Sequence, residues 1–296
     1  MSDITAALTG SVSATFHPHV ILHEDKPPDL ALTSTDHVSF YVHRAVLLAV
    51  SPNGLGGLIP AVKDSSKSLG TGMPHSVQTD LDAAALNVVL HVVYHLSFAH
   101  FYPDFSTLSR ATAALFDSYG LATYVFVAPA TPLYGALLSQ AVAHGPTSAM
   151  QVYILAAKHG LEALAIGVSE QLLSFEMSSL TDEQAAQLGG LYLKRLFLLL
   201  LARIGALKQL LVVEPGPLHP PIPICGQLEQ RRDVLAPWAY AVAHLIADAR
   251  PDTPSALLES TLNPVAYRCA CASCRLAIQE RVRVLVIEWS AVKRTI

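Results

Sequence analysis

The spacing of apolar residues changes in the middle of the stretch VSFYVHRAVLLAV, Val38–Val50. Every second residue from Val38 to Val42 is apolar, which is the period of a strand with one buried face. Residues 45–50 are continuously apolar and favour a helix. The polar pair His43-Arg44 separates the two patterns. We therefore predict a strand that passes into a helix at this pair.

A second strand precedes this one. Leu30 and Leu32 alternate with small residues, and the turn-forming residues 34–37 follow them, so residues 29–42 predict a β-hairpin. Glycines in the stretch NGLGG, residues 53–57, predict a short, irregular end to the following helix. We expect a mixed sheet of short strands within residues 29–80, covered by helices at 44–52, 83–97 and 106–119. A strand at residues 45–49 would contradict this prediction.

The second half of the chain is nearly all helical in pattern. Thr181 and Gln184 form a capping-box sequence in front of a long apolar segment. The most apolar part, Leu191–Val213, contains four basic residues and lacks the roughly 20 apolar residues that a membrane span requires. We therefore predict a core helix and no membrane insertion.

Composition narrows the function classes. Hydrophobic residues make up 52% of the 296 residues and charged ones only 14%, against about 25% charged in typical soluble domains. Such a weakly charged surface is expected to meet a protein partner. The net charge of −4 and the lack of a basic block argue against nucleic-acid binding. The first ten residues lack a basic secretory region, and four cysteines suit a reducing compartment, so we expect an intracellular protein, cytoplasmic or nuclear.

Three segments carry a family resemblance. DLALTSTDHVSFYVHRAVLLAVSP and LNVVLHVVYHL with LSRATAALFDSYGL resemble the BTB/POZ domain, through its hairpin, its HRAVL context and its closing helices. MQVYILAAKHGLEALAIGVSEQLL is similar to the BACK-like helical extension that follows this domain in many fungal proteins. The resemblance covers roughly residues 28–213 and implies an α+β fold. It divides the chain into an irregular segment (1–27), a BTB/POZ-like domain (28–128), a helical region (129–213), and a proline-rich linker with a C-terminal helical segment (214–296).

The resemblance implies a non-enzymatic scaffold or adaptor that forms a homodimer, with a protein partner that the sequence does not identify. In the family, an acidic residue at the position of Asp29 and a basic one at that of Arg44 lie in a charged pocket near the dimer interface. We therefore expect Asp29, His43 and Arg44 at an interface. The alternative is one intrachain salt bridge between Asp29 and Arg44 that joins strand to helix. Cullin ligase recruitment is weakly supported, because Val77-Gln78-Thr79 lacks the glutamate of the corresponding family motif.

The cysteines offer separate chemistry. Cys269, Cys271 and Cys274 form a C-x-C-x-x-C cluster, and either Cys225 or His219 could supply a fourth zinc ligand. Cys225 lies more than forty residues away, so we expect reduced cysteines without metal and no cofactor. A zinc-bearing adaptor remains the alternative.

The region around the cysteines also carries structural predictions. Pro264 is expected to interrupt the preceding helix. In the helix after the cysteines, Leu276, Ile278, Val282 and Leu285 are expected on one face.

A small metal-dependent enzyme is a further alternative, because His17 and His19 lie two residues apart, as on a strand of barrel hydrolases, and His23 follows. That fold needs eight strand–helix units, and the chain after residue 80 is helical in pattern. No nucleophile elbow or phosphate-binding loop occurs, so no residue is predicted to be catalytic.

Overall fold

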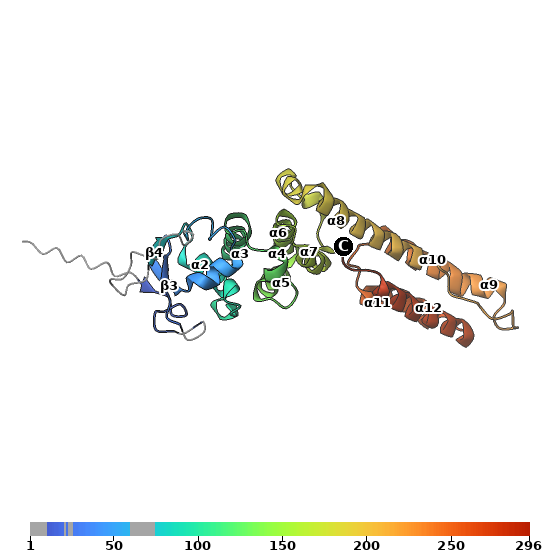
Figure 1. The fold of residues 1–296 in the computed structure, drawn as a ribbon. Helices are drawn as coiled ribbons and strands as arrows, with labels where there is room; N and C mark the ends of the chain where they lie inside the picture. The colour runs from blue at the N-terminus through green and yellow to red at the C-terminus, as the bar shows by residue number, and fades with distance from the viewer. Residues whose placement is uncertain (1–10, 21, 23–25, 60–74) are drawn as a thin grey trace, which may run out of the picture. The chain divides into compact units, whose positions relative to one another are not determined.

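The computed structural model describes residues 11–20, 22, 26–59 and 75–296 (Figure 1). The chain divides into two compact units. The first takes in the described residues up to His144 together with Leu155–Leu164. The second comprises Gly145–Ile154 and Ala165–Ile296.

The first unit contains a four-stranded mixed sheet in the order β1-β3-β2-β4. Strands β2 and β3 form the predicted antiparallel hairpin, with Leu32 opposite Phe40, and both side chains are buried. The Ser34 hydroxyl accepts the Val38 N–H at 3.0 Å and stabilises the turn between them. β1 runs parallel to β3, and β4 runs parallel to β2. The strands are β1 (Ser11–Val12), β2 (Leu30–Thr33), β3 (Val38–Val42) and β4 (His75–Gln78).

Helices follow the hairpin as the apolar pattern predicted. Helix α1 (Arg44–Val50) begins directly after His43, so residues 45–49 are helical and not extended. The NGLGG stretch forms turns in which Gly54, Gly56 and Gly57 have positive φ. The helices that follow are α2 (Ala83–Val93), η1 (Ala99–Phe101), α3 (Phe105–Ala113), the π-helical turn η2 (Ala114–Ser118), α4 (Thr123–Phe126), α5 (Pro132–Ala143), α6 (Gly145–Lys158) and α7 (Glu162–Ser169). Together with the sheet they give the α+β class that the sequence predicted.

The second unit is built mainly from long helices. The predicted capping box is confirmed: the Thr181 hydroxyl accepts the Gln184 N–H, and the Gln184 side chain accepts the Thr181 N–H. The helices are η3 (Glu170–Leu172), η4 (Met177–Ser179), α8 (Asp182–Leu211), α9 (Gln227–Gln230), η5 (Arg231–Leu235), α10 (Ala236–Ala247), α11 (Ser255–Arg268) and α12 (Ala272–Ala291). Figure 1 shows α11 and α12 side by side as a helical hairpin. Within the described residues, no helix is both long and apolar enough to cross a bilayer.

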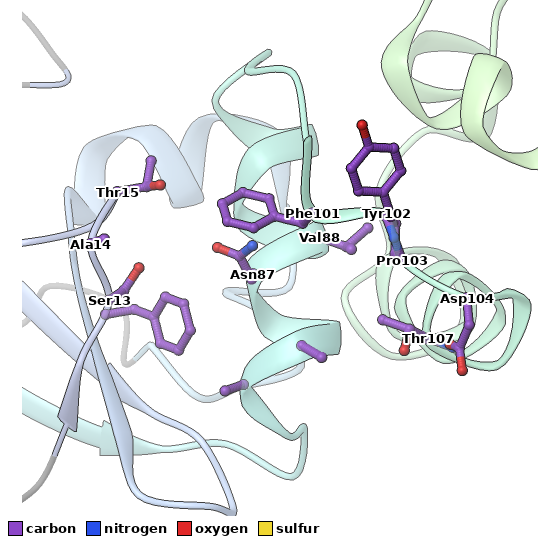
Figure 2. A pocket seen from close by; sticks show the side chains of 13 residues that line it. Ser13, Ala14, Thr15, Asn87, Val88, Phe101, Tyr102, Pro103, Asp104 and Thr107 are labelled. Carbon is purple, nitrogen blue, oxygen red and sulfur yellow. The ribbon is translucent and has the colours of Figure 1, made fainter. Parts of the chain in front are cut away.

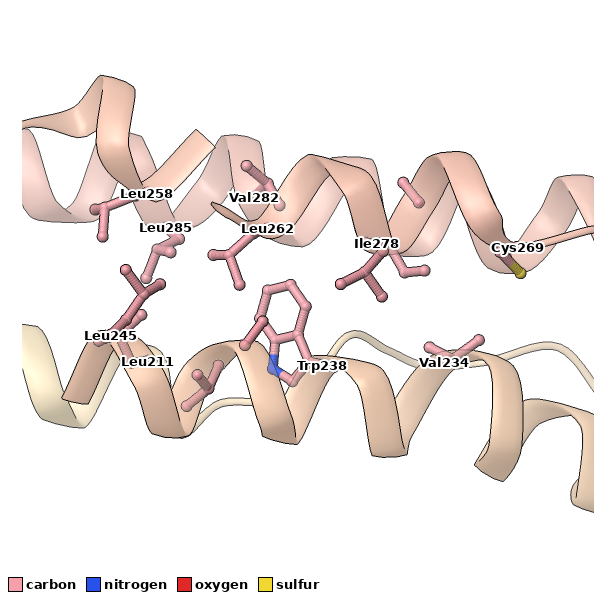
Figure 3. Close-up of a cluster of buried hydrophobic side chains, with 14 of the residues drawn as sticks. Leu211, Val234, Trp238, Leu245, Leu258, Leu262, Cys269, Ile278, Val282 and Leu285 are labelled. Atoms are coloured by element: carbon pink, nitrogen blue, oxygen red, sulfur yellow. The ribbon is translucent and has the colours of Figure 1, made fainter. Parts of the chain in front are cut away.

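One buried cluster joins the end of α8 to α10, α11 and α12. Figure 3 shows the Trp238 ring of α10 pointing toward Leu262 of α11. The cluster also contains Leu207 and Leu211 of α8 and a stripe along α12 formed by Ile278, Val282, Leu285 and Trp289. Cys225, Cys269 and Cys274 are buried members of the same cluster.

Two local predictions for this unit were wrong. Helix α11 runs through Pro264, because Leu262, Val265 and Ala266 around the proline are buried in the core. Their burial offsets the roughly 3 kcal/mol that proline costs inside a helix. Leu276 is 66% exposed, because its position two residues before Ile278 places it on the opposite side of α12 from the buried stripe.

Candidate metal centre and apolar groove

Four possible metal ligands converge at one end of the C-terminal core. His219 and Cys225 come from the proline-rich segment between α8 and α9. Cys271 is the N-cap residue of α12, and Cys274 lies in the first turn of that helix. The ligand atoms of these four residues, one imidazole nitrogen and three sulfurs, all lie within 4.8 Å of one another. We refer to them as the His-Cys cluster.

The distances within the His-Cys cluster are short. The Cys225 and Cys274 sulfurs are 3.7 Å apart. His219 Nε2 lies 3.2 Å from the Cys271 sulfur and 3.4 Å from the Cys274 sulfur. The other ring nitrogen, Nδ1, lies 2.7 Å from the Pro220 carbonyl oxygen. Because a carbonyl only accepts, Nδ1 carries a proton, and Nε2 is the nitrogen that faces the sulfurs.

Hydrogen bonds hold the loop that carries two of these ligands. Ile222 and Cys225 exchange backbone N–H···O bonds of 3.1 and 2.9 Å, which closes a tight turn just before α9. The Gln230 side chain of α9 donates to the His219 carbonyl at 2.9 Å. The loop is therefore fixed by α9 at one end and by its own turn at the other, independently of the sulfur contacts.

The three thiols lie in different electrostatic environments. The backbone N–H of Cys274 at the start of α12 lowers the pKa of Cys271 to about 6, so its sulfur is largely thiolate at neutral pH. Burial raises the pKa of Cys225 and that of Cys274. Contact with the Pro220 carbonyl raises the pKa of His219. One anionic sulfur beside two buried thiols and an imidazole is a donor set suited to a thiophilic divalent cation.

The structure selects among the residues that the sequence offered. Cys271 and Cys274 belong to the His-Cys cluster, whereas the Cys269 sulfur lies 3.6 Å from the Cys271 carbonyl oxygen and outside the set. Cys225 and His219 were alternatives for one position, and both are present. The sequence-based expectation of a metal-free segment rested on the long separation of Cys225 from the other cysteines. Helices α10 and α11 fold the chain back and bring Cys225 to 3.7 Å from Cys274.

The residues expected at an interface lie together at the start of α1. Asp29 Oδ1 accepts the backbone N–H of Arg44 at 2.8 Å. The carboxylate therefore stabilises the positive N-terminal end of α1, which is the role expected of an acidic residue there. His43 is buried, and its backbone N–H donates to the Tyr94 hydroxyl at 2.7 Å. His43 Nε2 lies 3.0 Å from the Lys26 carbonyl oxygen. Burial raises the pKa of Tyr94 to about 12, which keeps this hydroxyl protonated.

A groove of about 590 Å³ lies on the first unit, between the segment after β1 and helix α2 (Figure 2). Its rim carries Phe101 and Tyr102, which are 45% and 88% exposed. Among its lining residues the one carboxylate is Asp104, and that group accepts the Thr107 N–H as the N-cap of α3. The lining residues are Ser13, Ala14, Thr15, Phe40, Ala83, Ala84, Asn87, Val88, Phe101, Tyr102, Pro103, Asp104 and Thr107. The groove offers apolar surface and no paired acid and base for catalysis.

The N-terminal histidines that the sequence offered as metal ligands do not belong to the His-Cys cluster. The His17 and His19 rings are 5.2 Å apart, and neither belongs to the His-Cys cluster. His23 lies outside the described residues. Comparison of the chain with protein-family models, curated proteins and solved structures finds no match.

Proposed function

We propose that this chain is a non-enzymatic protein-interaction module, a scaffold or adaptor whose first unit is BTB/POZ-like and self-associates. The order of elements supports the proposal: a hairpin is followed by a helix and then by a strand that pairs in parallel with the first strand of the hairpin. Helices α2 and α3 follow this sheet. This order agrees with the resemblance carried by the segments around HRAVL and YGL.

The observation that carries the proposal is the apolar groove with its two exposed aromatic side chains. An aromatic ring 88% exposed beside a concave apolar surface is typical of a binding site, because an isolated monomer gains nothing from exposing both. The groove contains no arrangement of ionisable groups that could perform acid–base chemistry.

We propose that a second copy of this chain occupies the groove. A nearly uncharged groove suits a partner surface that is also apolar and weakly charged, and only 14% of the residues of this chain are charged. A net charge of −4 on each copy gives little repulsion at physiological salt, because charges farther apart than about 8 Å are screened.

Sedimentation velocity over a range of protein concentrations tests this function. The wild type should sediment as a dimer, and Tyr102→Asn should shift the equilibrium toward monomer. Asparagine tolerates the positive φ of 46° at this position, so the backbone is retained. Tyr124→Asn is the matched control, because Tyr124 is 80% exposed on the same unit but does not line the groove. A wild-type monomer at all concentrations would refute self-association.

A zinc-bearing adaptor is the second candidate function, and the His-Cys cluster favours it. Recruitment of a cullin ligase has no comparable support. Thr79, which stands where the expected motif has its glutamate, is buried and donates its hydroxyl to the Thr33 carbonyl at 3.3 Å.

A further inference from the structure

We propose that His219, Cys225, Cys271 and Cys274 bind one Zn²⁺ ion in a closed tetrahedral site with a structural role. The assignment is independent of self-association, because all four residues belong to the second unit and the groove belongs to the first. It also replaces the expectation, drawn from the sequence, that these cysteines hold no metal.

The ligand spacing fits zinc. Tetrahedral zinc with Zn–S bonds of about 2.3 Å and Zn–N bonds of about 2.0–2.1 Å places two sulfur ligands about 3.8 Å apart, and a sulfur and a nitrogen about 3.5 Å apart. The two buried sulfurs are 3.7 Å apart. The imidazole Nε2 lies 3.2 and 3.4 Å from its two nearest sulfurs. The other pairs of ligand atoms lie within 4.8 Å of one another, so small side-chain movements would bring all four atoms to one ion.

The surroundings of the imidazole match those of a metal-bound histidine. A histidine that ligates through one ring nitrogen usually donates its other N–H to a carbonyl or carboxylate, which fixes the tautomer and the ring plane. In this chain Nδ1 donates to the Pro220 carbonyl at 2.7 Å, and Nε2 is aimed at the sulfurs. Gln230 holds the His219 backbone from the other side at 2.9 Å.

The sulfurs also have the surroundings that thiolate ligands need. Cys271 is the N-cap residue of α12, so its sulfur lies at the positive end of that helix. Three thiolates and one divalent cation leave one net negative charge, which the positive end of α12 stabilises. Three sulfurs and one imidazole favour zinc over magnesium or calcium, which prefer oxygen ligands. Four protein ligands leave no open position for a substrate, so the site is structural and not catalytic.

Zinc at this position would join two parts of the unit that are distant in sequence. His219 and Cys225 lie in the proline-rich loop, and Cys271 and Cys274 lie where α11 passes into α12. The ion would close the end of the buried cluster to which Cys225, Cys269 and Cys274 already belong. Zinc binding would therefore add directly to the free energy of unfolding of this unit.

Elemental analysis of the full chain, purified without chelator from zinc-supplemented medium, tests the site. We expect about one zinc per wild-type chain and loss of most of it in Cys271→Ser and Cys274→Ser, since each removes one of four ligands. Cys269→Ser is the matched control: it removes a buried cysteine from the same C-x-C-x-x-C cluster, but its sulfur lies outside the ligand set, so zinc should be retained. A His219→Ala variant, which alters a loop residue and not a core one, should also lose zinc.

Two further measurements test zinc binding without the cysteine ligand variants, in case one of these folds poorly. Co²⁺ added to metal-stripped wild type should give thiolate-to-cobalt charge-transfer absorption, and Zn²⁺ should abolish it. A strong chelator should lower the melting temperature of the wild type and of Cys269→Ser, and should leave that of His219→Ala unchanged. Zinc well below one equivalent in the wild type, equal zinc in Cys274→Ser, or an intact mass showing a Cys225–Cys274 disulfide would each overturn the assignment.

Discussion

Arg203 is a buried cation of the second unit, and its removal should destabilise that unit strongly. The side chain extends from α8 and is 1% exposed. Its Nε donates to the Pro251 carbonyl at 2.7 Å, and one terminal nitrogen donates to the carbonyls of Val292 and Lys293 at 2.7 and 2.9 Å. The guanidinium carbon lies 4.2 Å from the centre of the Trp289 ring. The residue thus connects α8 to the turn before α11 and to the end of α12.

The expected magnitude follows from these contacts. A hydrogen bond from a charged group contributes about 1.5–3 kcal/mol, and a desolvated cation–π contact contributes about 2 kcal/mol. Burying the guanidinium costs several kcal/mol, which offsets part of this sum. Arg203→Met keeps much of the side-chain volume but leaves three carbonyl oxygens without their donor. We expect it to lower the free energy of unfolding by about 3–5 kcal/mol, a range typical of breaking a buried charged contact.

Tryptophan fluorescence during urea unfolding measures this effect. The chain has two tryptophans, Trp238 and Trp289, and both belong to the buried cluster of the second unit, so the signal reports that unit alone. Arg232→Met is the control, because the Arg232 side chain is 73% exposed and pairs only with Asp233 among the described ion pairs. The control should lose less than about 1 kcal/mol. A loss below about 1 kcal/mol in Arg203→Met would show that water or a neighbouring group replaces the guanidinium at little cost, and the reasoning would fail.

Two further predictions concern the first unit. Asp82 accepts the Ala85 N–H at 2.9 Å as the N-cap of α2 and pairs with Arg110; Asp82→Ala should therefore lower the free energy of unfolding by about 1–2 kcal/mol. Asp82→Asn keeps the cap and should lose less than about 1 kcal/mol. Urea titrations followed by circular dichroism measure both variants, and equal losses in Asp82→Ala and Asp82→Asn would argue against the capping role. Burial lowers the pKa of His91 below its ordinary value, so the unfolded state binds more protons, and stability should fall as the pH drops through the folded-state pKa. His91→Gln should weaken this decrease between about pH 7.5 and about pH 5, and an unchanged pH dependence would exclude His91 as its source.

The parts of the fold that the sequence predicted correctly depend on local patterns. The change of period after Val42 fixes where β3 ends and α1 begins, because an alternating strand and a continuously apolar helix bury their side chains differently. The capping box at Thr181 likewise needs only residues that lie three apart. Such signals are complete within a few residues, so no knowledge of distant contacts is required.

The parts that were not predicted depend on distant partners. β1 is two exposed residues and β4 is the mostly polar HSVQ, so neither shows a buried face, and each is defined by its pairing with the hairpin. The His-Cys cluster is similar: Cys271 and Cys274 were visible as a C-x-x-C pair. The participation of His219 and Cys225 depends on how α10 and α11 fold the chain back. The sequence offered His219 and Cys225, at the two ends of the segment HPPIPIC, only as alternatives for one fourth ligand.

The buried cluster of the second unit also affects how the chain folds while it is being synthesised. Its members on α8 and α10, such as Leu211 and Trp238, leave the ribosome well before Leu262 of α11 and Leu285 of α12, against which the cluster closes. Until α11 and α12 emerge, these apolar side chains lack the residues that they pack against in the folded unit. An intermediate with such exposed apolar surface is prone to aggregate. We therefore expect nascent chains that have emerged from the ribosome as far as about residue 250 to bind chaperones that recognise apolar segments, and to release them once α12 has emerged.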